Sequence, residues 1–254
     1  MKSANRKPGS GGREPPQVPA ARRKAKSPAQ GAAKAASPVR RAASERRGYG
    51  GRSAAELHAE RRARLLDAGL ELFAQRGYAR TSIETLCSAA RVTTRHFYEL
   101  FPSREALLVA LYEQIVGEAR QAVLAAFLAP EPDPKQRIHK GLNAFIRSYV
   151  EDARRARIGV LEAVGISPAL EQRRREVIHE FAQIIRSYAD SLVAAGLLPK
   201  RDFHLLSVAL VGGINELLAE WLTVAEPPSI RVLTDEIALM LQALILGGQQ
   251  LKPP

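Results

Sequence analysis

The chain has 254 residues, 46% of them hydrophobic, which is enough for one large or two small domains with a real core. Its formal net charge of +12 lies entirely in residues 1–52, which hold 14 Lys and Arg against two acidic residues, while the other 202 residues hold 24 basic and 24 acidic side chains. A single cysteine excludes an internal disulfide framework, and the sequence has neither the apolar segment of a secretory signal nor a run of about 18 to 20 apolar residues, so we expect a cytoplasmic protein without a membrane span.

Residues 1–52 predict a disordered basic arm. The segment is rich in Gly, Ser, Pro and Ala and contains no Leu, Ile, Phe or Trp. Such a composition buries too little apolar surface to offset the entropy lost on ordering. Two interpretations of the arm stay open: it binds DNA through its charge, or translation begins downstream and the arm is not made.

The first helices follow directly after the arm. Leu66, Leu70 and Phe73 recur at helical spacing, which predicts a helix over 57–76 that ends before Gly77. Thr81 followed by Glu84 indicates a capping box at the start of a short helix that runs to residue 90. A second short helix is expected over 94–100, and a long helix after position 103.

The rest of the chain continues the helical pattern. Helices are expected over 134–151, 152–165, 168–196, 202–225 and 229–247, each separated from the next by Pro or Gly. No segment alternates with period two for long enough to form a sheet, so the expected fold class is all-α. The run Arg173-Arg174-Arg175 is expected on a polar, solvated helix face.

Two short helices separated by three residues predict a helix-turn-helix. In that motif the first turn of the second helix meets base edges, while helix starts meet phosphates. Thr94, Arg95 and His96 are polar donors on that turn, and Tyr98 follows one turn after Thr94. The alternative is that these residues only cap the helix, face solvent or pack in a core, and each of them alone fits that interpretation.

The sequence from about residue 62 to 112 resembles the DNA-binding domain of the TetR family of bacterial transcription regulators. The match is carried by LLDAGLELFAQRGYARTSIETLCSAARVTTRHFYELFPSREALL, in which helix lengths, caps and aromatic positions agree together. The chain departs from the family where Arg91 and Arg95 replace common glycines and where Arg104 replaces lysine. A left-handed conformation at Arg91 would cost about 1 kcal/mol, whereas Arg95 favours base reading because Arg is the commonest partner of guanine.

The resemblance implies a division into the arm (1–52), a three-helix helix-turn-helix domain (53–102) and a helical ligand-binding and dimerisation domain (103–248). It implies that double-stranded DNA, as a palindromic operator, and a small-molecule effector are the partners. The DNA contacts that it implies come from the recognition helix and from two helix starts: Thr93, Thr94, Arg95, His96, Tyr98, Thr81, Ser82 and Arg104.

Two late segments, 205–222 and 237–246, are apolar almost all round, which indicates burial on every side. Packing of both against the same helices of a second copy would give a four-helix homodimer interface, and the resemblance places the dimer there. The alternative is a core helix of a monomer. The expected interface residues are Val208, Gly212, Gly213, Leu217, Trp221, Ile237, Leu241 and Leu244.

The middle helices would enclose the effector if the family's arrangement holds. The candidate lining residues all lie on or near apolar faces, where ordinary core packing is the alternative for each: Phe145, Tyr149, Glu162, Tyr188, Asn215 and Trp221. The five histidines show no i, i+4 pairing, so no metal or other cofactor is expected. Cys87 is expected to be a small buried hydrophobe, with a redox role as the alternative.

The leading hypothesis is therefore a dimeric transcription regulator. It would act as a repressor that leaves its operator when a small molecule binds. An alternative of a different class is a DNA-compacting protein that binds through the basic arm without reading bases. An all-helical enzyme is the third possibility, but no catalytic set can be singled out in the sequence.

Overall fold

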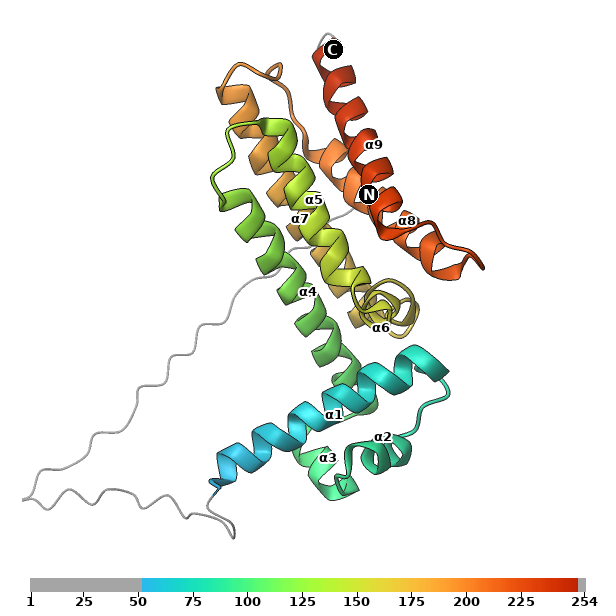
Figure 1. Ribbon diagram of the computed structural model, residues 1–254. Coiled ribbons are helices and arrows are strands. Elements are labelled where there is room, and N and C mark those ends of the chain that lie inside the picture. The colour runs from blue at the N-terminus through green and yellow to red at the C-terminus, as the bar shows by residue number, and fades with distance from the viewer. Residues whose placement is uncertain (1–51, 251–254) are drawn as a thin grey trace, which may run out of the picture. The chain divides into compact units, whose positions relative to one another are not determined.

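The computed structural model describes residues 52–250, with side chains in its last helix given through residue 241 and at 243 (Figure 1). The helices run in the order α1 (Ala54–Arg76), α2 (Ile83–Ala90), α3 (Thr94–Leu100), α4 (Arg104–Leu128), α5 (Pro134–Val150), α6 (Ala153–Ala156), the π-helix η1 (Arg157–Glu162), α7 (Pro168–Ala194), α8 (His204–Thr223) and α9 (Ile230–Gln250). The described chain contains no strand, and the all-α prediction is confirmed. The prediction of a disordered arm concerns residues that, Arg52 apart, lie outside this description.

The first three helices form the bundle that the sequence predicted. Ser53 begins α1 with a capping box, because its hydroxyl accepts from the Glu56 amide and the Glu56 carboxylate accepts from the Ser53 amide. Gly77 ends α1 with φ +83°, a conformation that favours glycine. At α2 the prediction of the cap was wrong by one residue: Ser82, not Thr81, is the N-cap, and its hydroxyl accepts from the Thr85 amide.

A compact set of apolar side chains holds these helices and the start of α4 together. Leu65, Phe73, Leu86, Phe97 and Leu107 come from four different helices, and all are completely buried. Burial of a side chain of this size stabilises the fold by about 1.5 to 3 kcal/mol. The orientation of α3 is therefore fixed mainly by Phe97, which leaves the opposite side of that short helix free.

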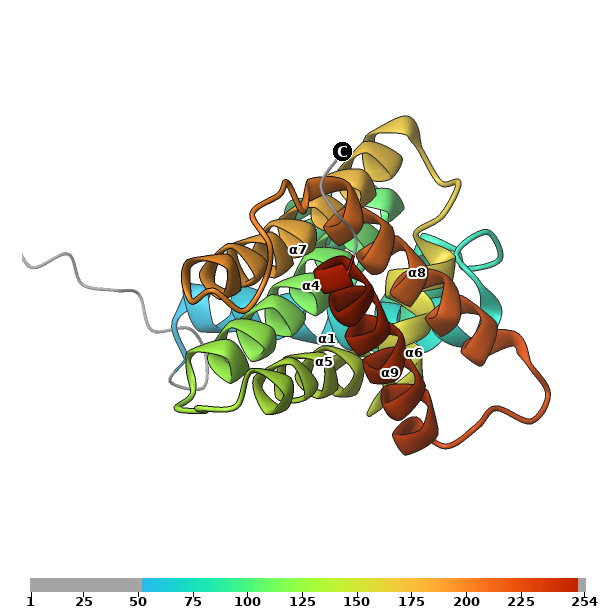
Figure 2. The ribbon, with the colours of Figure 1, turned by 90° about the horizontal axis from the view of Figure 1, so that it is seen from above.

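The longer helices pack in pairs. Helix α4 lies along α5, α7 lies along α8, and α9 packs on α5 (Figure 2). Buried side chains from Leu65 to Ala238 form one continuous cluster, which includes residues on both sides of the predicted domain boundary at residue 102. That boundary therefore stays a prediction.

The segment 152–165 differs from the single helix that the sequence predicted. It forms the short α6, followed by η1 with its wider π turn, and η1 packs against α1, α4 and α8. Gly159 lies so close to Tyr149 that a Cβ there would come within 2.7 Å of the ring. The close approach therefore requires glycine at this turn. Single π turns are frequent at functional sites.

Candidate nucleic-acid interface

The turn between α2 and α3 places α3 against α2 through a left-handed residue. Arg91 has φ +53° and ψ +47°, the one positive φ of a non-glycine residue in the described chain. Its amide donates to the carbonyls of Cys87 and Ser88, which closes α2. Thr93 then begins α3, since its hydroxyl accepts from the His96 amide. The left-handed conformation considered for Arg91 is thus present.

One side of α3 is buried and the other carries the predicted contact residues. Phe97 is completely buried, whereas Thr93 and Thr94 are exposed and Arg95 has an 87% exposed side chain. Tyr98 is 55% exposed although it is aromatic, and His96 is half-buried with Nδ1 2.9 Å from the Thr93 hydroxyl. The predicted recognition residues therefore lie together on a surface of hydrogen-bond donors at the start of a helix, which is the chemistry that base edges and phosphates require.

Thr81 belongs to the core, contrary to the prediction that it contacts phosphate. Its side chain is completely buried, and its hydroxyl donates to the carbonyl of Gly77 at 2.9 Å. The Leu72 carbonyl lies 3.4 Å from the same oxygen. A phosphate cannot reach this hydroxyl while the turn is intact. The adjacent Ser82 is exposed at the start of α2, and its phosphate contact stays a prediction.

Arg104 is bound within the protein. Its guanidinium lies over the Tyr78 ring, 4.2 Å from the centroid, and Nη1 donates to the Thr81 carbonyl. These contacts connect the start of α4 with the turn between α1 and α2. A cation–π contact of this kind contributes about 0.5 to 2 kcal/mol. Arg104 therefore positions the motif, and its predicted phosphate contact is untested.

The helix-turn-helix region is similar in sequence to known transcription regulators. Residues 65–111 match the model of the tetR family of bacterial regulatory proteins. The helix-turn-helix domain of the chain is therefore of the TetR type. It is 29% identical over 123 residues to the transcriptional regulator EthR of Mycolicibacterium smegmatis, a match that spans 48% of this chain and 56% of EthR. It is 26% identical to the regulator AcrR of Shigella flexneri over 198 residues, or 74% of this chain and 90% of AcrR.

The fold also matches solved structures of this family. The regulator FadR of Bacillus subtilis, solved in complex with stearoyl-CoA, superposes with a TM-score of 0.64 at 17% identity, over 73% of this chain and 98% of FadR. At this identity the match shows a shared fold, while the tetR-type helix-turn-helix of residues 65–111 indicates a DNA-binding protein.

The predicted effector residues separate into three groups. Phe145, Tyr149 and Asn215 line one small cavity, and Tyr188 lines another. Glu162 lines neither: its Oε2 accepts from the Tyr78 amide at 2.9 Å, which connects η1 with the end of α1.

Trp221 also lies away from these cavities. Its Nε1 donates to the Pro228 carbonyl at 2.7 Å and holds the connection between α8 and α9. Glu162 and Trp221 line none of these cavities, and both side chains hold backbone segments, so their effector role stays a prediction.

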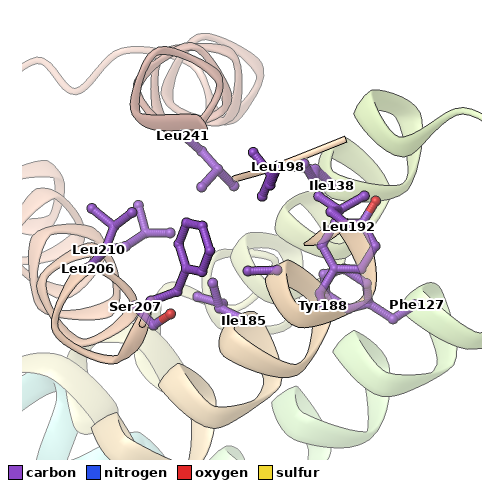
Figure 3. Close-up of a pocket in the computed structure, with 12 residues that line it drawn as sticks. Phe127, Ile138, Ile185, Tyr188, Leu192, Leu198, Leu206, Ser207, Leu210 and Leu241 are labelled. Carbon is purple, nitrogen blue, oxygen red and sulfur yellow. The ribbon is translucent and has the colours of Figure 1, made fainter. Parts of the chain in front are cut away.

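Two adjacent apolar cavities, each of about 60 Å³, lie among these helices, the first of them shown in Figure 3. Of the residues that line them, the sequence predicted only Tyr188 and Phe145 as effector contacts. The two cavities share a wall whose residues come from α4, α5, α7, α8 and α9: Phe127, Ile138, Ile185, Leu210 and Leu241. The apolar stripe of α7 was visible in the sequence, but nothing in it distinguishes a wall around a cavity from an ordinary packed face.

In the arginine run of α7 only Arg175 is exposed as predicted. Arg173 binds the carboxylates of Glu113 and Glu180, and its side chain is 25% exposed. Arg174 pairs with Glu171 at 3.2 Å and lines the cavity of Tyr149. A helix can turn two consecutive basic side chains toward its neighbours when acidic partners lie opposite. Those partners lie 60 residues away on α4 or one to two turns along α7.

The predicted dimer face needs a correction on α9. Ile237 is completely buried within the chain, and Leu241 lines the apolar cavities. The exposed apolar face of α9 is instead formed by Val232, Leu239 and Ala243, with Leu239 62% exposed. The side chain of Leu244 lies outside the described side chains.

On α8 the predicted residues do lie at the surface. Val208, Gly212, Gly213 and Trp221 are partly exposed and Leu217 is exposed. Leu205, which the sequence did not single out, is 79% exposed. By length and composition α8 could cross a membrane, contrary to the sequence analysis, and 28% of its most apolar stretch is buried within the described chain.

Cys87 and the acidic and histidine side chains give no sign of a metal or redox centre in the part of the chain described. Residues 52–250 contain no group of three or more His, Cys, Asp or Glu that could hold a metal ion. Cys87 is buried, and burial raises the pKa of its thiol. A raised pKa leaves less of the reactive thiolate.

Proposed function

We propose that this chain is a homodimeric repressor that binds a palindromic operator through α3 and leaves it when a small molecule binds between the helices of its C-terminal half. The observation that carries the proposal is the division of α3 into a buried Phe97 and an exposed donor face that includes Arg95 and Tyr98. We propose a cytoplasmic location, which the TetR relatives support, and no enzymatic activity.

The exposed apolar faces of α8 and α9 support the dimer. Leu205 and Leu217 on α8 and Leu239 on α9 are large hydrophobic side chains that water reaches in the single chain. Large exposed apolar patches mark association sites. Gly212 has no atom within 4 Å of the position that a Cβ would take, so a second backbone can approach it closely. A twofold axis would pair the two faces and place two copies of α3 for two half-sites about 34 Å apart.

The effector signal would pass through η1. Tyr149, which lines a cavity, packs on Gly159 of η1, and Glu162 three residues later accepts from the Tyr78 amide. The guanidinium of Arg104 lies over the Tyr78 ring and donates to the Thr81 carbonyl beside α2. A shift of η1 would therefore reach both ends of the α1–α2 turn. FadR in complex with stearoyl-CoA is a precedent for a small molecule bound within this fold.

Selection of binding sites from random DNA tests the proposal. The full chain and a chain without residues 1–52 would each be selected at two salt concentrations. An enriched palindrome that survives removal of the arm supports a regulator that reads bases through α3. Enrichment of no sequence by either chain contradicts the proposal.

Compaction of DNA through the arm is a second candidate that the charge distribution favours. Residues 53–102 contain seven arginines and six acidic residues, so the domain that carries α3 is almost neutral, whereas residues 1–52 carry +12. Phosphate neutralisation makes affinity fall steeply with salt. Binding that disappears with the arm and shows no motif would support compaction in place of operator recognition.

A further inference from the structure

Three cavities follow one another through the C-terminal half of the chain. The two apolar cavities share the wall of Figure 3, and the second shares Phe145, Phe181 and Val211 with the cavity of Tyr149. Along α7 the lining runs from Arg174 through Phe181 to Leu192 on one face. The eighteen steps from Arg174 to Leu192 correspond to about 27 Å at about 1.5 Å each.

The lining changes from apolar to polar along this row. The distal cavity is lined almost entirely by aliphatic and aromatic side chains, and its Tyr188 hydroxyl already donates to the Pro134 carbonyl. The proximal cavity instead contains Arg174, Asn215 and the rings of Tyr112 and Tyr149. A molecule that fills the row therefore needs an apolar chain at one end and a polar group at the other.

The polar end has donors without acceptors. Tyr112 and Tyr149 are 3% and 4% exposed, and within residues 52–250 neither hydroxyl has a hydrogen-bond partner; the same holds for the Asn215 amide. Neither hydroxyl is a fully buried unpaired atom in the described chain, so both open onto the cavity, where a bound group can accept from them. Burial raises the pKa of Tyr112 to about 12 and raises that of Tyr149 further, so both phenols remain protonated donors.

These donors fit a carboxylate. Arg174 uses one guanidinium nitrogen on Glu171 and keeps others free, and it contributes the positive charge that a carboxylate requires. No acidic side chain lines the proximal cavity. The cavity itself is only about 10 Å³, roughly the room of one water, so entry of a head group requires the rings to move.

We propose, on the basis of the effector role above, that the effector is a linear amphipathic carboxylate. Its head group binds Arg174, Tyr112 and Tyr149, and its hydrocarbon chain extends along α7 into the two apolar cavities. The enclosed polar end selects a free acid over a thioester with a large polar carrier such as coenzyme A.

Calorimetric titration of the purified full chain tests this assignment, with each probe below its micelle concentration. The probes are dodecanoate, 1-dodecanol and dodecanoyl-CoA, which share one chain and differ in the head group. We expect saturable binding of dodecanoate, and weaker binding of the alcohol and the thioester. Equal affinity for acid and alcohol, or tighter binding of the thioester, would overturn the assignment.

Variants locate the head group. Arg174→Gln is expected to weaken dodecanoate about tenfold to a hundredfold, the range for a hydrogen bond to a charged group, and to leave 1-dodecanol unchanged. Arg175→Gln is the matched control, since Arg175 is the next residue of α7, exposed, and lines neither the proximal nor the apolar cavities. Tyr149→Phe keeps the ring on Gly159 and removes only the hydroxyl, so its loss of acid binding cannot be attributed to misfolding. Unchanged dodecanoate affinity in both Arg174→Gln and Tyr149→Phe contradicts the assignment.

A change at the distal end locates the hydrocarbon chain. Ala189 lines only the distal apolar cavity, so Ala189→Phe is expected to abolish the preference for hexadecanoate over octanoate, while the exposed Ala194→Phe keeps it. Binding of an operator is measured separately. Operator binding without saturable acid binding contradicts the ligand class alone, and acid binding without any enriched operator contradicts the regulator alone.

Discussion

Thr81→Val separates a core role from a DNA-binding role at the first turn of the motif. Valine has the shape of threonine, so the substitution removes little more than the hydroxyl that donates to the Gly77 carbonyl. Since the residue is completely buried, the carbonyl loses its partner where water cannot replace it. We expect a loss of about 1 to 2 kcal/mol in the free energy of unfolding. For a chain of this size that lowers Tm by about 2 to 4 °C per kcal/mol.

Ser82→Ala is the matched control for Thr81→Val. It removes the neighbouring hydroxyl, which caps α2 but is exposed, and costs about 1 kcal/mol of stability. Thermal melts at equal protein concentration are combined with operator titrations well below Tm, where both variants are folded. We expect Ser82→Ala to weaken operator binding and Thr81→Val to leave it unchanged. A Thr81→Val chain with the original Tm and reduced operator affinity would show that the hydroxyl meets DNA after all.

Three further predictions concern base reading, dimerisation and the effector signal. Arg95→Ala is expected to relax the base preference at one position of each half-site by about 1 to 3 kcal/mol in competition titrations, and an unchanged preference would exclude Arg95 from base reading. Leu239→Glu is expected to shift the mass measured by light scattering toward the monomer, whereas Leu128→Glu, at a more exposed leucine on α4, should not; a dimer in both would place the interface elsewhere. Glu162→Gln removes the charge that accepts from the Tyr78 amide, so we expect retained operator affinity with a smaller release by effector, and full release would exclude this connection.

The helices could be predicted from the sequence because each boundary is a local event. Helix α3 was expected over 94–100 and lies at Thr94–Leu100, since Thr93 caps it and Phe101 leaves the helical conformation. The π turn of η1 was not predicted, because it depends on the approach of Tyr149 to Gly159 from a different helix. A helix cap depends on residues adjacent in the sequence and can be predicted from them, whereas a close contact between two helices depends on residues far apart in the sequence.

The recognition surface was predicted better than the effector cavities for the same reason. On a helix of seven residues one buried aromatic, Phe97, decides which side chains face outward. The position of Ile237 was wrong because α9 is apolar on more than one side, and the sequence does not say which side meets the chain's own α5 and which meets a second copy. Arg174 was assigned to solvent because an arginine run usually is solvated. Its cavity forms only where α7 meets α4, α5, η1 and α8, which the sequence of α7 alone does not reveal.

The proposed head-group site and the proposed signal meet at one contact. Tyr149 would turn its hydroxyl toward a carboxylate, and the same ring rests on Gly159, whose helix ends at Glu162. A change from about 1% to 99% of one dimer geometry requires about 5.5 kcal/mol of differential binding. Hydrogen bonds to a charged group contribute about 1.5 to 3 kcal/mol each, so a guanidinium and two hydroxyls at the polar end match that requirement. A hydrocarbon chain alone, which touches only the distal walls and not η1, should bind without releasing DNA.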